Sequence, residues 1–169
     1  MKVVVSDTSS LILLSKASVL EAACSSYEIY LPPSVEKEAS SIELRERYPD
    51  AARIHDLIRG GTLKVRKLSS RGRQMPIQLG LGEADSIRLF LQLKARVLLS
   101  DDGKAIKACR MLKIPFIISP NIVMELYSKE VLTRDQALLG LEKLRIFGRY
   151  SPDIIASLLL KMKPEEDNE

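Results

Sequence analysis

The stretch GLGEADSIRLFLQLKARVLLSDDGKAIKACRMLKIPFII (residues 80–118) decides the fold, because helical and extended patterns alternate along it. Apolar residues first recur at helical spacing and then form a short unbroken run, and the same pair of patterns follows again. Strands that alternate with helices are typical of an α/β protein with a parallel sheet. We expect a helix over residues 83–94, a strand over 96–100, a helix over 104–112 and a strand over 114–118.

The same alternation starts at the N-terminus. The run KVVVS (residues 2–6) is short, apolar and β-branched, which suits a strand buried on both faces of a parallel sheet. A helix is expected next, and then a second strand that ends at two prolines. Ser34 is a plausible N-cap for the helix after these prolines, which we expect to begin at Val35. The remaining expected elements are a helix over residues 11–23, a strand over 27–31, a helix over 51–58 and a strand over 63–68.

The last third of the chain shows helical patterns only. We expect one helix over residues 121–128, and a hairpin of two helices within 132–163. The sequence as a whole predicts a single α/β domain over residues 1–164, with a central parallel sheet flanked by helices. Its C-terminal helices occupy about residues 121–163. The acidic tail, residues 165–169, is expected to be disordered.

Composition excludes several classes of protein. No stretch approaches the ~18 apolar residues of a membrane-spanning helix, and an acid follows the N-terminus too early for a signal peptide. We therefore expect no membrane association and a cytoplasmic location. Two cysteines and one histidine provide neither a disulfide framework nor a zinc cluster. The chain also lacks Gly-rich nucleotide-binding loops and a Gly-x-Ser-x-Gly elbow, so nucleotide cofactors and serine acyl transfer receive no support.

The basic residues are unevenly distributed. The formal net charge is +4, and four acids lie within the last five residues. Residues 57–82 contain no acid, and this basic segment favours a polyanionic partner, although a solvated basic loop would have the same composition. Its bases are Arg59, Lys64, Arg66, Lys67, Arg71 and Arg73.

Acidic residues follow several of the expected strands. The carboxyl ends of parallel strands meet at one edge of a sheet, so these acids would converge there. A single acid in such a position is often a helix cap, but acids from four segments would repel one another unless a cation lay between them. Carboxylate oxygens favour a hard divalent ion, Mg²⁺ or Mn²⁺. The acids are Asp7, Glu36, Glu38, Glu83, Asp101 and Asp102.

Four phrases resemble the PIN domain family in order and spacing. They are VVSDTSSLI (residues 4–12), LPPSVEKE (31–38), GEADSI (82–87) and VLLSDDGKA (97–105). The resemblance covers about residues 2–120, and the C-terminal helices more loosely. The third and fourth phrases are most similar to a prokaryotic subgroup of PIN-like proteins whose members often resemble the toxins of toxin–antitoxin pairs.

This resemblance implies a metal-dependent ribonuclease with Mg²⁺ or Mn²⁺ as its cofactor. The family's Val-x-x-Glu spacing fits Glu38 better than Glu36. Its last acid, two residues after a Thr or Ser, selects Asp102, with Asp101 as the alternative. The family often has Asp where this chain has Glu83, so Glu83 could also act through a water. The implied catalytic residues are Asp7, Glu38, Glu83, Asp101 and Asp102, with Ser9 in support, and the implied metal ligands are Asp7, Glu83 and Asp102.

The implied mechanism is hydrolysis of RNA. A metal ion would polarise the phosphate and bind a water, and Glu38 would orient that water. The bases Lys64, Arg66, Lys67, Arg71 and Arg73 would bind the RNA backbone. The alternative is a catalytically silent, nucleic-acid-binding or regulatory PIN-like module. The implied protein partners are an antitoxin and a second copy of the chain, since PIN-like proteins commonly pair and symmetric dimers are the commonest closed assembly.

Overall fold

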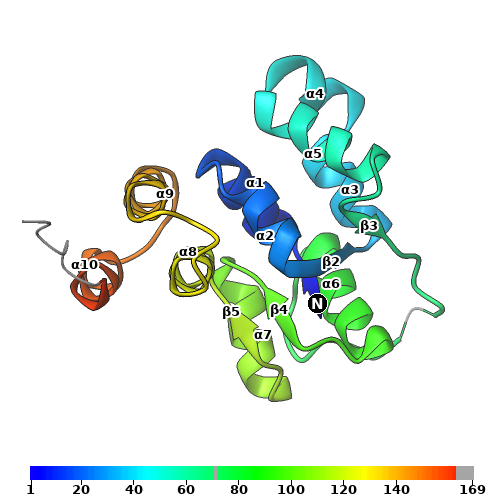
Figure 1. The fold of residues 1–169 in the computed structure, drawn as a ribbon. Helices are drawn as coiled ribbons and strands as arrows, with labels where there is room; N and C mark the ends of the chain where they lie inside the picture. Colours follow the sequence, from blue (N-terminus) through cyan, green and yellow to red (C-terminus); the bar gives the residue numbers. More distant parts are fainter. Residues whose placement is uncertain (71, 163–169) are drawn as a thin grey trace, which may run out of the picture.

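A central parallel sheet organises the chain in the computed structural model, which describes residues 1–70 and 72–162 (Figure 1). Five strands of this described part pair in the order β3-β2-β1-β4-β5, and each pair is parallel. The α/β fold with a central parallel sheet is therefore confirmed. The strands are β1 (Lys2–Ser6), β2 (Tyr27–Leu31), β3 (Lys64–Val65), β4 (Val97–Leu99) and β5 (Phe116–Ile117).

Helices cover both faces of the sheet. Successive residues of a strand point to opposite faces, so neighbouring residues of β1 belong to different cores. Val4 belongs to a core formed with α1, α2, α8, α9 and α10, whereas Val5 belongs to a core formed with α6 and α7. The helices are α1 (Thr8–Lys16), α2 (Leu20–Ser26), α3 (Pro33–Ser40), α4 (Ile42–Arg47), α5 (Pro49–Arg59), α6 (Leu81–Leu93), α7 (Gly103–Leu112), α8 (Ser119–Ser128), α9 (Arg134–Phe147) and α10 (Pro152–Lys161).

The helix expected over residues 11–23 is wrong, since this stretch holds the ends of two helices. Ser18 adopts a left-handed backbone with φ of 59°. The amide of Val19 donates to Leu14, and that of Ser18 donates to Ser15, at 3.0 Å each. These are the two bonds of a Schellman helix end, which usually contains glycine. Because Ser18 stands where glycine is usual, the sequence pattern did not indicate the end of α1.

Prolines set the helix boundaries between β2 and β3. Helix α3 begins at Pro33 after the N-cap Pro32, so the expected start at Val35 with a Ser34 cap is wrong. The polar stretch 45–50 is helical on both sides of Tyr48, which has an extended backbone. A residue before proline avoids the helical conformation, and this rule separates α4 from α5 at Pro49.

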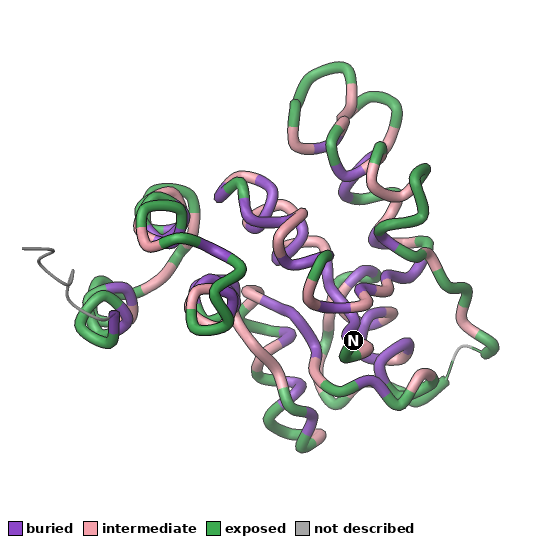
Figure 2. Tube along the Cα trace, in the orientation of Figure 1, coloured by how far each residue is buried: buried purple, intermediate pink, exposed green. Residues whose placement is uncertain are grey.

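The C-terminal helices pack against the first core. Thr133 caps α9 and forms a capping box with Gln136. Leu141, Leu144 and Leu158 are buried, and the outer faces of α9 and α10 are exposed (Figure 2). No helix of residues 1–70 and 72–162 has the length and apolar character needed to cross a membrane. The predicted disorder of residues 165–169 lies outside the described residues.

Candidate metal centre and nucleic-acid surface

The candidate metal centre lies where the sheet changes direction. Strand β1 lies between β2 and β4, and the chain adds β3 beyond β2 but β5 beyond β4. Ligands of open α/β sheets bind at this switch point, outside the carboxyl ends of the strands. The amide of Asp7 donates to Leu99 at 3.0 Å, so the ends of β1 and β4 lie side by side. The acids after both strands therefore share one edge.

Asp7 is the buried member of the site, with 1% of its surface exposed. Its Oδ1 accepts hydrogen bonds from the Ser9 hydroxyl at 2.8 Å and the Ser10 amide at 3.0 Å. Its Oδ2 accepts a bond from the Ser100 hydroxyl. Burial raises the pKa of Asp7 to about 7, although these three bonds act in the opposite direction. Ser9 was predicted to support the catalytic acids, and its hydrogen bond to Asp7 is the contact that such a role requires.

Glu38 reaches the same edge from α3. Its Oε2 accepts a hydrogen bond from the Thr8 hydroxyl at 2.6 Å, and its Oε1 accepts one from the Gly82 amide at 3.1 Å. A Cβ atom at Gly82 would collide with the Glu38 carboxylate. The absence of a side chain at Gly82 therefore lets the start of α6 approach α3. The Gly82 amide then holds the Glu38 carboxylate in place.

Glu83 lies in the first turn of α6 and is half-buried. Its pKa is raised, first by burial and then by the negative charges of Asp102 and Glu38. Three carboxylates from separate elements are therefore close enough to influence one another electrostatically. Such mutual repulsion is the condition that a bound cation relieves.

The adjacent residues Asp101 and Asp102 have different surroundings. Asp102 is the N-cap of α7 and accepts a hydrogen bond from the Ala105 amide at 2.8 Å. Its own amide donates to the Ser100 hydroxyl at 3.3 Å, and that hydroxyl also contacts Asp7. Asp101 instead accepts hydrogen bonds from α1, α8 and the turn before α10. The charge of Asp102 contributes to the raised pKa of Glu83, whereas the charge of Asp101 contributes to the raised pKa of Asp7.

The donor chemistry of this edge fits a divalent cation, although the described side chains do not enclose one. Within residues 1–70 and 72–162, no three His, Cys, Asp or Glu side chains are grouped closely enough to hold a metal ion. The edge nevertheless offers carboxylate oxygens from three elements, and the charges that shift the pKa of Glu83 within the described part of the chain are those of the acids Asp102 and Glu38. Oxygen-only donors with excess negative charge are the preferred environment of Mg²⁺ and Mn²⁺.

The predicted nucleic-acid-binding bases occupy two different environments. Lys64 is paired with Glu28 at 2.5 Å and lies 5.6 Å from the centre of the Tyr30 ring. Arg66 lies over the same ring, also at 5.6 Å. These two bases are thus held at the β3 edge of the sheet. Lys67 and Arg73 are exposed, and the predicted contact by Arg71 lies outside the described residues.

Helix α6 holds the basic segment in place. Gln92 accepts hydrogen bonds from the amide and hydroxyl of Ser69, at 2.8 and 3.1 Å, and donates to the carbonyl of Lys67 at 3.1 Å. Leu68 and Ile77 pack against the core beneath α6 and α7. The chain at Lys67 and Ser69 is therefore held beside α6, unlike that of a freely solvated loop.

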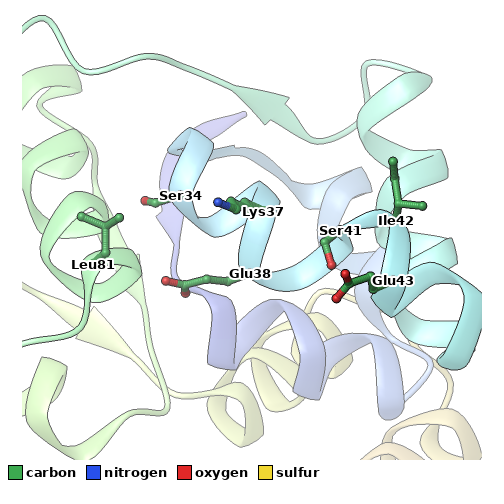
Figure 3. Close-up of a pocket in the computed structure, with 7 residues that line it drawn as sticks. All are labelled: Ser34, Lys37, Glu38, Ser41, Ile42, Glu43 and Leu81. Atoms are coloured by element: carbon green, nitrogen blue, oxygen red, sulfur yellow. The ribbon is translucent and has the colours of Figure 1, made fainter.

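Three adjoining surface hollows connect the acidic edge to the basic segment. The first, of about 540 Å³, lies where Ser34 and Glu38 on α3 are directed toward α6 (Figure 3). Leu81 belongs to this hollow and to the second, of about 590 Å³. Arg88 belongs to the second and to the third, of about 440 Å³, which ends at Gln92. These shared residues place the three hollows next to one another, and we refer to them together as the path along α6.

Sequence reasoning missed several residues of this surface. Arg88 donates to Asp85 at 3.0 Å, and Asp85 accepts a bond from Ser34 at 2.7 Å. The Arg88 Nε is buried and has no hydrogen-bond partner among the described residues. The three-residue spacing of Asp85 and Arg88 is a helical ion-pair signal that the sequence offered. Thr8 gave no such signal, because its partner Glu38 is 30 residues away.

Comparisons with known proteins identify the family. The family model DUF3368, described as a PIN domain, matches residues 3–164, and the chain belongs to the PIN domain family. A PilT N-terminus domain protein from the hyperthermophilic archaeon Sulfolobus solfataricus P2 is similar in structure. Its TM-score is 0.52 at 15% identity, over 73% of this chain and 92% of that one. This likeness shows the shared fold. A search of curated proteins finds no match.

The predicted resemblance to PIN domains is thus confirmed. PIN domains are generally nucleases, and they typically use divalent metal ions. Both properties agree with an acidic edge at the switch point of the sheet.

Proposed function

We propose that this chain is a metal-dependent endoribonuclease that hydrolyses phosphodiester bonds of RNA. The observation that carries this proposal is the position of Asp7. Its carboxylate is buried at the switch point of the sheet, where Ser100 connects it to the amide of Asp102. Family membership supports the nuclease class.

Asp7, Glu83 and Asp102 are the residues that would hold Mg²⁺ or Mn²⁺. When bound, such an ion polarises the phosphate and lowers the pKa of a water molecule. Glu38 would orient the attacking water and accept its proton, since its carboxylate is fixed by Thr8 and Gly82. These hydrogen bonds keep Glu38 at the edge without placing it among the proposed ligands.

The path along α6 is the proposed RNA-binding surface. It begins beside Glu38 and ends beside the exposed base Lys67, whose carbonyl is bonded to Gln92. From Glu83 to Gln92 the helix axis rises by about 14 Å, which several nucleotides can span. Lysine and arginine contacts to phosphates give affinity with little sequence selectivity, and they weaken with salt.

A cleavage assay tests this function. The parent protein should cut a labelled single-stranded RNA when Mn²⁺ is added and should not cut it with chelator present. Asp7→Asn should bind the RNA without cutting it, and the control Asp153→Asn, at an exposed position on α10, should cut like the parent. Binding by the parent without any metal-dependent cleavage would identify the catalytically silent module instead.

The role as a toxin stays a prediction of the family resemblance. Its test is growth arrest when the parent protein is expressed, with normal growth for Asp7→Asn at the same level of expression. An antitoxin partner would then be sought by co-purification with the inactive variant.

A further inference from the structure

Asp101 is saturated with hydrogen bonds. Its Oδ2 accepts bonds from the hydroxyls of Ser10 at 2.7 Å and Ser119 at 2.5 Å. Its Oδ1 accepts bonds from the Ser119 amide at 2.9 Å and the Tyr150 hydroxyl at 2.5 Å. Both oxygens are thus engaged by neutral donors from three different segments, which is the pattern of a structural carboxylate rather than of a metal ligand.

The same segment that binds Asp101 also holds Asp7. The amide of Asp101 donates to the Ser9 hydroxyl at 3.1 Å, and that hydroxyl donates to Asp7 at 2.8 Å. Ser10 uses its hydroxyl for Asp101 and its amide for Asp7. Ser9 and Ser10 therefore each connect the two aspartates, and every link of both connections is a hydrogen bond. Any displacement of Asp101 would be transmitted to the side chain of Asp7.

Tyr150 extends this network to the C-terminal helices. It lies in the turn between α9 and α10, and its ring folds back so closely that a Cβ atom at Gly148 would collide with it. Burial and the charge of Asp101 raise the pKa of Tyr150, so its hydroxyl stays protonated and donates at neutral pH. Ser119, the first residue of α8, is buried and makes the second connection.

We propose that Asp101 is a positioning residue, which couples the C-terminal helices through Tyr150 and Ser119 to the carboxylate of Asp7. This inference rests on the proposed function only in taking Asp7 as a metal ligand. It separates the tasks of the adjacent acids, with Asp102 directed toward the cation and Asp101 directed toward the fold. It also assigns a role in the site to Tyr150, a residue of the helical hairpin.

Amide hydrogen exchange tests the coupling without any activity. In Tyr150→Phe, which keeps the ring, exchange of the Ser119 and Ser10 amides should accelerate by about tenfold. The control Thr133→Ala removes the cap at the start of α9, the end of that helix remote in sequence from Tyr150, and leaves the contacts of Asp101 in place. It should leave the Ser10 amide unchanged. Faster exchange at Ser119 with an unchanged Ser10 would show that the coupling ends at Asp101, and would overturn the proposal.

Mn²⁺ binding by calorimetry tests the division between the two acids. Asp101→Asn keeps one acceptor oxygen for Tyr150, and its amide group can donate to serine hydroxyls that reverse their role. It should therefore bind Mn²⁺ with nearly parental affinity, whereas Asp101→Ala should lose about tenfold. Asp102→Asn should lose more than either. Equal losses in Asp101→Asn and Asp102→Asn would make Asp101 a ligand and overturn its positioning role.

The two experiments keep this inference separate from the proposed function. If the parent neither binds Mn²⁺ nor cuts RNA, the proposed function fails, and the exchange of the Ser10 amide still decides whether the hairpin is coupled to Asp7. If the parent binds Mn²⁺ but Tyr150→Phe changes neither exchange nor Mn²⁺ affinity, the coupling fails and the nuclease proposal stands.

Discussion

The hydroxyl of Ser100 donates a hydrogen bond to the buried carboxylate of Asp7, from which it is separated by 93 residues of sequence. The same hydroxyl accepts a bond from the amide of Asp102. One small side chain at the end of β4 thus joins the first acid of the chain to the helix cap of α7. The candidate metal centre depends on this contact between neighbouring strands.

Ser100→Ala should weaken the metal centre. It removes one hydrogen bond to Asp7 and leaves the Asp102 amide without its partner, so Mn²⁺ affinity should fall by about tenfold. Stability should fall by about 1 kcal/mol. Calorimetry and urea unfolding measure the two effects. Ser128→Ala, which removes an exposed hydroxyl bonded to the Glu125 carbonyl, is the control. Parental Mn²⁺ affinity in Ser100→Ala would show that this serine does not position Asp7.

The metal-free protein should lose stability as the pH rises from about 4 to 7. In this window the Asp7 carboxyl has lost its proton in the unfolded chain, whose pKa is near 3.8, but keeps it in the folded chain, whose pKa is about 7. The folded state therefore binds the extra proton, and its contribution is lost with rising pH at up to about 1.4 kcal/mol per pH unit. Urea unfolding at several pH values measures this slope.

Asp7→Asn is the comparison for that slope, because the amide does not titrate. Its free energy of unfolding should change less with pH across the same window. Below pH 4, where Asp7 is protonated in both states of the parent, the slopes of the two proteins should become equal. Identical slopes for parent and variant would show that Asp7 titrates normally. Because Mn²⁺ must displace the Asp7 proton, the parent's affinity for Mn²⁺ should rise up to about pH 7.

Gly82→Ala should separate activity from stability. The three atoms nearest to the added methyl group all belong to the Glu38 carboxylate, the end of a flexible side chain that can swing away. Alanine also favours a helix over glycine by up to about 1 kcal/mol, so unfolding should become no easier. Cleavage should nevertheless fall by about 100-fold, because Glu38 is displaced from its position. Gly103→Ala is the control, since nothing lies within 4 Å of its added methyl group. Full activity in Gly82→Ala would exclude a precise role for Glu38.

The exposed bases beside α6 should carry the salt dependence of RNA binding. Replacing both Lys67 and Arg73 by alanine should reduce the salt slope for single-stranded RNA by about 1.4, since each lost phosphate contact removes about 0.7. Lys64→Ala should have little effect, because Lys64 is paired with Glu28. Fluorescence anisotropy in the Asp7→Asn background measures binding without cleavage. A larger effect from Lys64 than from the pair would place the RNA at the β3 edge instead.

The predicted homodimer should involve the outer face of the C-terminal helices. Leu139 and Ile146 on α9 are 56% and 61% exposed, and Leu160 on α10 is 88% exposed. Sedimentation velocity should give the mass of a dimer, and Leu160→Glu should shift the protein toward monomer. Leu81→Glu, at an exposed leucine on α6 away from these helices, is the control. A monomer mass for the parent at high concentration would remove the dimer.

Local sequence patterns were sufficient for the order of the strands and for most of the helices, although they merged α1 with α2 and did not predict α4. The run of residues 2–6 matches β1, and Asp7 follows it as expected, because a buried apolar run and an abrupt acid are visible without any tertiary contact. The parallel arrangement of the strands was enough to predict that Glu38 and Glu83 approach each other. A serine in a left-handed helix end and a proline N-cap escaped these patterns, since neither residue is the usual one at its position.

Only the tertiary structure decided which neighbours each acid has. Asp101 and Asp102 are adjacent in sequence, and the family spacing from Ser100 favoured Asp102 but left Asp101 as the alternative. Their roles differ because Ser119 and Tyr150, 18 and 49 residues further along, reach Asp101 alone. In the same way Glu28, 36 residues away, forms an ion pair with the exposed Lys64 and competes with a phosphate for it. Hydrogen bonds and ion pairs between distant residues depend on the order of strands in the sheet and on the packing of helices against it. Residue type and spacing therefore predicted the candidate groups for the chemistry, and the fold determined their partners.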